Sequence, residues 1–259
     1  MKKIAPIRPL TTIFSYVFVG VVALLVLFPA LLLLAILPEK QRRSNTVIFW
    51  SLDLFYRSVI FSLRTPILHE KNGSGNGGNG GNGGNGGNGG NVIWVANHQS
   101  SIDIPLLGAL LKGRPHIWYA LAYYARKPIL GFFIKRIGFA LDRDSASGSA
   151  HGLLRGLRAL SKNPCDVMIF PEGARFNDGN VHEFLHGFVV IARKTKLPVV
   201  PVYMPFNGRV YPPEAFWLRR HHLVVFVGPS FELLSDETDE AFVARVRGWF
   251  LEKQALINV

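Results

Sequence analysis

The stretch NHQSSID, residues 97–103, places a histidine five residues before an aspartate. An imidazole can take a proton from a hydroxyl group, and a carboxylate bonded to its other nitrogen fixes the tautomer that does so. The same residues also have a structural explanation, because Ser100 and Asp103 are spaced like the capping box of a helix. Residues five apart on one helix point about 140° apart, so His98 can meet Asp103 only from before the helix. We therefore expect a strand, a turn holding His98, and a helix in which Asp103 serves both purposes.

Two further polar motifs come directly after apolar runs. ALDR ends in Asp142 and Arg143, and FPEGARF carries Glu172 and Arg175. Ligands of an open α/β sheet gather beyond the carboxyl ends of its strands, so these side chains are expected at the same edge as His98. A surface ion pair is the alternative explanation for Asp142 and Arg143.

Short β-branched or aromatic runs alternate with helical patterns after residue 91. This alternation predicts an α/β domain with a largely parallel, mixed sheet flanked by helices. The expected strands are 92–96, 116–120, 139–141, 166–170, 199–203 and 223–227. The expected helices are 102–111, 149–160, 187–194 and 240–257, and a hairpin-like strand is expected at 66–69.

The amino-terminal segment 13–37 contains 25 residues and no charge. It is long enough to cross the ~30 Å of membrane hydrocarbon and longer than the core of a signal peptide. We therefore expect a retained hydrophobic helix that anchors the protein in a membrane.

The segment 47–63 is also apolar but carries Asp53 and Arg57, which argue against a second span. It is expected as an interfacial helix that packs its small residues, Ser51, Ser58 and Ser62, against the first helix. A buried helix of the soluble domain is the alternative. The expected organisation is a two-helix membrane anchor at 1–64, followed by one domain at 65–259.

A Gly/Asn-rich segment at 72–91 interrupts the chain. Its glycines match the G-x-G-x-x-G phosphate-binding pattern, but repeated NGG triplets match any glycine spacing by periodicity alone. The segment is expected to be a flexible insertion.

The chain is strongly basic, with 29 lysines and arginines against 17 acids and a net charge of +12. Such an excess attracts nucleic acid, anionic lipid or phosphorylated ligands. No RRM, KH or OB signature supports nucleic-acid binding. Basic residues instead alternate with apolar ones in YYARKPILGFFIKRIGF, residues 123–139, which favours a surface that lies against a membrane.

The ordered motifs resemble those of the glycerol-phosphate acyltransferase superfamily, and within it the 1-acyl-sn-glycerol-3-phosphate acyltransferases. NHQSSID resembles the family's N-H-x-x-x-x-D motif, and IGFALDR resembles a second block that ends in arginine. FPEGARF resembles the F-P-E-G-T-R-S block, and LPVVPVY resembles a later proline-valine block. The four blocks occur in the family's order between about residues 92 and 203.

The resemblance implies that residues 65–259 form a membrane-bound acyltransferase domain that acts in phospholipid biosynthesis. It would transfer a fatty acyl chain from a thioester to the hydroxyl of lysophosphatidate and so make phosphatidate. His98 would be the catalytic base and Asp103 its partner, and Glu172 would orient an arginine or a glycerol hydroxyl. The substrate phosphate would be bound by Arg143, Glu172, Gly173 and Arg175.

Neither a metal nor a cofactor is expected. The acyl donor, acyl-CoA or acyl carrier protein, would be a substrate, and the other partners would be the lysophospholipid acceptor and membrane lipids. No nucleic-acid partner is expected. The expected location is the inner, cytoplasmic membrane, with the catalytic domain facing the cytoplasm.

Three positions depart from the family's pattern. Ala174 replaces the usual threonine, Phe176 the usual serine, and His186 a frequent lysine. The first two departures remove hydroxyl groups near the expected phosphate. Alternatives are therefore an acyltransferase for another lysolipid and a non-catalytic basic lipid-binding protein.

Overall fold

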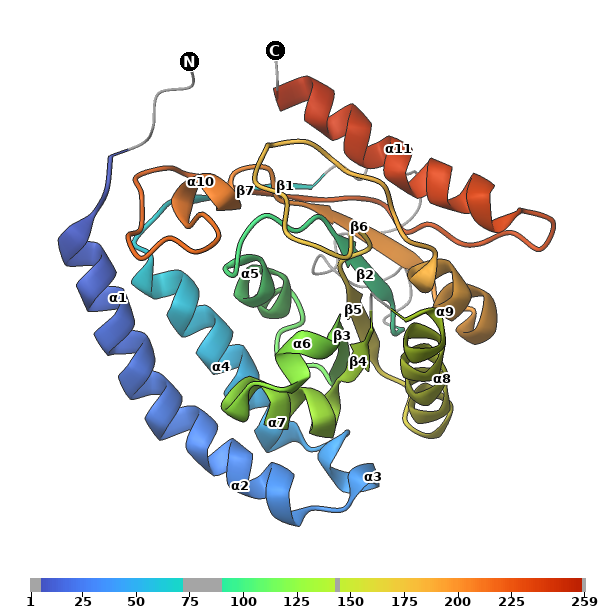
Figure 1. Ribbon diagram of the computed structural model, residues 1–259, viewed down its shortest axis with the longest axis horizontal. Coiled ribbons are helices and arrows are strands. Elements are labelled where there is room, and N and C mark those ends of the chain that lie inside the picture. The colour runs from blue at the N-terminus through green and yellow to red at the C-terminus, as the bar shows by residue number, and fades with distance from the viewer. Residues whose placement is uncertain (1–5, 72–89, 143–144, 258–259) are drawn as a thin grey trace, which may run out of the picture.

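The apolar runs expected as strands form one seven-stranded sheet. The computed structural model describes residues 6–71, 90–142 and 145–257. Within them the strand order is β1-β7-β6-β2-β5-β3-β4 (Figure 1). Only the β6–β7 pair is antiparallel, which confirms the largely parallel, mixed sheet. The strands are β1 Ile67–Lys71, β2 Ile93–Ala96, β3 His116–Leu121, β4 Phe139–Leu141, β5 Asp166–Ile169, β6 Val199–Tyr203 and β7 Leu223–Val227.

The central strands are buried on both faces, as their continuous apolar runs require. In β2, Ile93 and Val95 belong to the hydrophobic core on one face of the sheet, and Trp94 and Ala96 belong to the core on the other. Three helices cover the first face: α8 Ala146–Lys162, α9 Gly187–Thr195 and α11 Asp239–Ile257. The other face carries α5 Asp103–Ala109 and α10 Asn207–Val210.

The amino terminus forms one long curved helical rod (Figure 1). It consists of α1 Pro9–Val22, a π-helical stretch at Ala23–Leu27 and α2 Phe28–Ile36. The wide turn lies just before Pro29, whose missing N–H interrupts the regular bonding ladder. Among the described residues, this is the helix long and apolar enough to cross a membrane, with mean hydropathy 3.0. Its outer face leaves large aliphatic side chains such as Leu24 and Leu25 exposed.

The second apolar helix, α4 Thr46–Ser62, lies between this rod and the sheet domain (Figure 1). Ser51, Ser58 and Ser62 are buried, and Ser15 of α1 donates to the carbonyl of Ser62 at 2.7 Å. On its other side, the ring of Tyr56 lies so close to Gly108 that a Cβ there would come within 2.4 Å. The boundary expected at residue 64 therefore falls between α4 and α5, although these two helices pack directly against each other.

Two further helices lie on the same side of the molecule as α4 (Figure 1). They are α6 Ala122–Ala125 and α7 Pro128–Ile137, while the short α3 Glu39–Arg42 precedes α4. Ile129 and Leu130 at the start of α7 are exposed, beside the basic residues of the same segment.

Strand β1 differs from the expected hairpin, because it pairs in parallel with β7 at the edge of the sheet. Since β7 runs antiparallel to β6, β1 and β7 begin at the edge where β2 and β6 end. Most of the Gly/Asn-rich insertion, residues 72–89, lies outside the described residues.

Asp166 at the start of β5 generates a stability prediction. It accepts a hydrogen bond from the N–H of Val92 at 2.8 Å and pairs with Arg114 at 3.2 Å. Burial raises its pKa from 3.8 to about 6, so between these values the folded chain binds more protons than the unfolded chain. The stability that Asp166 contributes therefore falls as pH rises through this window, by up to ~3 kcal/mol.

Asp166→Asn removes this titration. We expect the melting temperature of the variant minus that of the wild type to rise by several degrees between pH 4 and pH 7, on the order of 2–4 °C per kcal/mol. The exposed Asp236→Asn is the control and should show little change. A temperature difference independent of pH would contradict the buried titration.

Candidate active site

The candidate site begins where β2 ends. The side chain of Asn97 accepts from the N–H of Met204 at 2.7 Å and donates to the Met204 carbonyl at 3.1 Å. These two bonds fix the ends of β2 and β6 side by side. His98 follows in the turn before α5, as the spacing predicts.

The Asp103 carboxylate is fully buried and accepts four hydrogen bonds. Its Oδ2 lies 2.7 Å from His98 Nδ1 and accepts the N–H groups of Gln99 and Ser100 at 2.6 and 2.8 Å. Its Oδ1 accepts from Asn207 Nδ2 at 2.7 Å. A carboxylate can only accept here, so His98 carries its proton on Nδ1 and keeps the Nε2 lone pair free.

The capping box is half formed. The N–H of Ser100 bonds Asp103, as the reciprocal arm of such a box requires, and α5 begins at Asp103. The Ser100 hydroxyl instead donates to the Tyr211 carbonyl at 2.6 Å. Asp103 thus both orders the turn and orients the imidazole.

Aromatic packing fixes the plane of the imidazole ring. His98 stacks on Phe170 with centroids 4.0 Å apart and planes inclined by 12°, and Phe170 stacks in turn on Trp118. The side chain of His98 keeps 14% of its surface exposed, which leaves an approach for a substrate.

Glu172 joins two loops by accepting hydrogen bonds from their backbone N–H groups. Its Oε2 accepts from the N–H of His98 at 2.8 Å, and its Oε1 accepts from the N–H of His182 at 3.0 Å. Burial raises the pKa of this carboxyl, although both N–H groups favour its ionised form. These contacts let Glu172 position the His98 turn, and its expected role of orienting an arginine or a glycerol hydroxyl stays a prediction.

Arg175 lies beside the turn that holds His98. It donates to Ser101 Oγ at 2.7 Å and to the hydroxyl of Tyr124, and its guanidinium lies 5.6 Å from the Tyr124 ring centroid. Gly173 has φ +66°, and a Cβ there would come within 2.8 Å of Leu185, so glycine suits the position. The same segment is tied to the turn by the Phe176 N–H, which donates to the His98 carbonyl at 2.9 Å.

The structure describes only some of the other residues expected at the site. Arg143 lies outside the described residues, and Asp142 follows β4 at their boundary. Phe176, one of the departures from the family pattern, stacks on His182 with centroids 3.7 Å apart. His186 is exposed at the start of α9. Within the described residues, no group of three His, Cys, Asp or Glu residues could hold a metal ion.

Sequence reasoning missed Asn207, Tyr124 and Ser101. Asn207 could have been suspected, because it is a polar residue shortly after β6. Nothing in the sequence pairs Tyr124 or Ser101 with Arg175, because only folding brings these side chains together. The assembled site places an oriented imidazole near an arginine, an arrangement suited to deprotonating a hydroxyl on an anionic molecule.

The family model described as Acyltransferase matches residues 82–205. The chain is 29% identical to a chloroplastic 1-acyl-sn-glycerol-3-phosphate acyltransferase of Brassica napus, over 56% of this chain and 43% of that protein. It is 30% identical to the Saccharomyces cerevisiae 1-acyl-sn-glycerol-3-phosphate acyltransferase, over 60% and 52%. It is also 30% identical to the lyso-ornithine lipid O-acyltransferase of Pseudomonas aeruginosa, over 45% and 43%.

The chain thus spans about half the length of these curated relatives. The fold is that of the 1-acyl-sn-glycerophosphate acyltransferase PlsC from Thermotoga maritima, with a TM-score of 0.71, 21% identity and 95% of each chain covered.

The contact between Asn207 and Asp103 generates a prediction about stability. Asn207→Ala removes a donor from a buried carboxylate and should cost about 1.5–3 kcal/mol of unfolding free energy. Asn207→Asp should cost more at pH 7, because two carboxylates then face each other, and should recover as acid protonates the pair. Denaturant unfolding at pH 7 and pH 5 measures both variants. Equal losses for the two variants at both pH values would contradict the contact.

Proposed function

We propose that the chain is an acyltransferase, as the family model matched by residues 82–205 indicates, and that it transfers a fatty acyl chain from a thioester to the hydroxyl of lysophosphatidate. The product would be phosphatidate and a free thiol. The observation that carries the proposal is the buried Asp103 carboxylate, which bonds His98 Nδ1 and leaves Nε2 free, in a turn that Arg175 bonds through Ser101.

The proposed reaction is a direct transfer. His98 Nε2 takes the proton of the acceptor hydroxyl while its oxygen attacks the thioester carbonyl carbon. Collapse of the tetrahedral intermediate breaks the C–S bond, and the leaving thiolate takes the proton back from His98. Asp103 stabilises the transient imidazolium and holds its orientation.

The residues offer no better route through an acyl-enzyme. The sequence has no G-x-S-x-G motif, and its single cysteine, Cys165, is buried. Burial raises the pKa of that thiol to about 12, so a nucleophilic thiolate is not available there. Direct transfer from acyl-CoA or acyl carrier protein within a ternary complex is the simpler mechanism.

We further propose that the acceptor arrives from a membrane. The outer face of the α1–α2 rod exposes aliphatic side chains along its length, and Trp50 and Phe61 of α4 are also exposed. The other face of the rod packs on α4, so immersion of the outer face would bring the sheet domain to the lipid head groups. A cytoplasmic orientation at the inner membrane would place the catalytic turn where acyl thioesters are made.

Another lysolipid is the second candidate acceptor. Phe176 and Ala174 supply no hydroxyl where the family pattern has two. A relative of this chain carries the name of an acyltransferase for lyso-ornithine lipid, whose head group is an amino acid. An acceptor panel must therefore include lysolipids with and without phosphate.

The decisive test combines such a panel with His98→Ala. Purified full-length protein would be incubated with each lysolipid and with acyl-CoA or acyl carrier protein, and products would be identified by mass. We expect phosphatidate from the wild type and a loss of about 10²–10⁴ in rate for His98→Ala, because the base is missing. The control is His151→Ala, at an exposed position on α8. Wild-type turnover by His98→Ala would refute the mechanism.

Arg175→Gln tests phosphate recognition. Loss of a charge-assisted contact should raise the KM for lysophosphatidate about 10- to 100-fold with little change in kcat. The same variant should lose little on an acceptor without phosphate. Arg155→Gln, at an exposed position on α8, is the matched control. Equal losses on both acceptor types would mean that Arg175 supports the turn through Ser101 rather than binding phosphate.

A further inference from the structure

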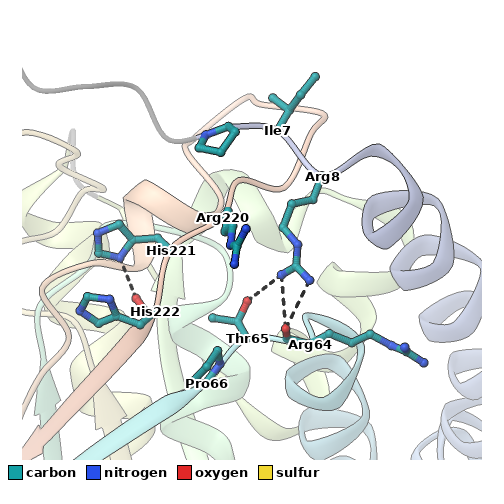
Figure 2. A pocket seen from close by; sticks show the side chains of 9 residues that line it. Ile7, Arg8, Arg64, Thr65, Pro66, Arg220, His221 and His222 are labelled. Atoms are coloured by element: carbon teal, nitrogen blue, oxygen red, sulfur yellow. Dashed lines mark hydrogen bonds between the residues drawn. The ribbon is translucent and has the colours of Figure 1, made fainter.

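A basic pocket of about 700 Å³ lies beside the start of α1. It is built by three segments that are distant in sequence: the residues before α1, the connection from α4 to β1, and the approach to β7 (Figure 2). We call it the basic pocket. Its lining residues are Pro6, Ile7, Arg8, Arg64, Thr65, Pro66, Arg220, His221 and His222.

Backbone bonds hold the three segments together. The N–H of Arg8 donates to the Leu218 carbonyl at 2.8 Å, and the N–H of Arg220 donates to the Pro6 carbonyl at 2.9 Å. The N–H of Leu223 donates to the Pro66 carbonyl at 3.0 Å. The pocket is therefore formed by the fold and needs no ligand to assemble it.

The pocket contains three arginines and no acidic residue. Among the described residues, Arg8 donates to uncharged acceptors, the Leu63 carbonyl at 3.1 Å, the Arg64 carbonyl at 3.3 Å and Thr65 Oγ1 at 3.1 Å. The Leu63 and Arg64 carbonyls lie at the C-terminal end of α4, so the helix dipole offsets part of the positive charge of Arg8. Arg220 is exposed and has no carboxylate partner within the described part of the chain.

The Arg8 and Arg220 side chains line the same pocket. Figure 2 shows Arg8 and Arg220 pointing toward the region above Thr65 and Pro66, whereas Arg64 points away. The Arg64 guanidinium instead lies 4.5 Å from the centre of the Phe14 ring. Neither the Arg8 nor the Arg220 guanidinium is neutralised by a carboxylate within the described residues, and a phosphate bound in the pocket would offer both of them charge-assisted hydrogen bonds.

The basic pocket lies at the catalytic edge of the sheet but is separate from the His98 site. Its residues precede β1 and β7, which begin where β2 ends, and two strand spacings, about 10 Å, separate β7 from β2. Phe206 lies between the two sites. Its ring is 4.9 Å from His221, while the next residue, Asn207, bonds Asp103.

The apolar face of the rod begins directly beside the basic pocket. Leu10, two residues after Arg8, is 84% exposed, and Ile13 and Val17 continue the same face. If this face enters a leaflet, the pocket lies at the depth of the phosphate groups.

We propose that the basic pocket binds the phosphate group of an anionic membrane phospholipid, at a site distinct from the acceptor site. The bound lipid would fix the start of α1 in the leaflet and keep the catalytic edge facing it. This proposal rests on the membrane contact proposed above for α1 and not on acyl transfer.

Arg220→Gln tests the proposal by vesicle flotation of the full chain. Vesicles would contain phosphatidylcholine alone or with phosphatidylglycerol, which is neither substrate nor product of the proposed reaction. We expect the wild type to prefer the anionic vesicles and Arg220→Gln to lose about tenfold or more in partitioning to them, because a directed arginine–phosphate contact is lost. Partitioning to neutral vesicles and activity on a short-chain acceptor should not change.

Arg126→Gln removes an exposed arginine beside the apolar start of α7 and is the matched control. A cation that acts only through diffuse attraction contributes about 1 kcal/mol, or roughly fivefold. Arg220→Lys should give an intermediate loss, because lysine keeps the charge but not the paired donors. Circular dichroism verifies that each variant is folded. Equal losses for Arg220→Gln and Arg126→Gln would overturn the proposal.

Titration of the detergent-solubilised chain with inorganic phosphate separates the two sources of the ligand. Saturable binding that is lost in Arg220→Gln, together with Arg220-dependent flotation, supports the lipid site. The same binding with flotation indifferent to Arg220 would support a phosphate site but overturn its assignment to lipid. No phosphate binding and no preference for anionic vesicles would overturn both.

Discussion

The burial of one charge, the Asp103 carboxylate, organises the catalytic edge. A buried carboxylate must be matched by donors, and here they come from the turn before α5, from the His98 ring and from Asn207 after β6. Satisfying that carboxylate fixes the course of the turn and the tautomer of the imidazole, and it ties the turn to Asn207 after β6. The geometry of the candidate site and the local fold are therefore consequences of the same set of bonds.

The sequence predicted much of this arrangement because its signals are local. Apolar runs such as those of β5 and β6 identify buried strands, and the spacing of His98 and Asp103 identifies a turn before a helix. The contacts of Asn207 and of Tyr124 could not be predicted in this way, because each joins residues at least 50 positions apart. The observed contacts of Glu172 could not be predicted for a related reason: its partners are backbone N–H groups, which no residue type reveals.

Helix α4 shows why the amino-terminal rod and the sheet domain are not easily divided here. Its serine face receives α1, and its aromatic face receives α5, whose first residue is Asp103. A displacement of the rod would thus reach the catalytic turn through two helix contacts. Charge patterning alone indicated an interfacial helix, and the packing explains why the same helix is also part of the core.

The direction of β1 has a separate consequence for where this chain can carry a label. Because β1 and β2 run in opposite directions, Lys71 and Gly90 lie at the edge of the sheet opposite to His98. Strands β7 and β6 lie between β1 and β2, so the lateral distance between these two positions is about 14 Å. A fluorophore or an affinity tag attached at either position would therefore lie at the sheet edge remote from His98.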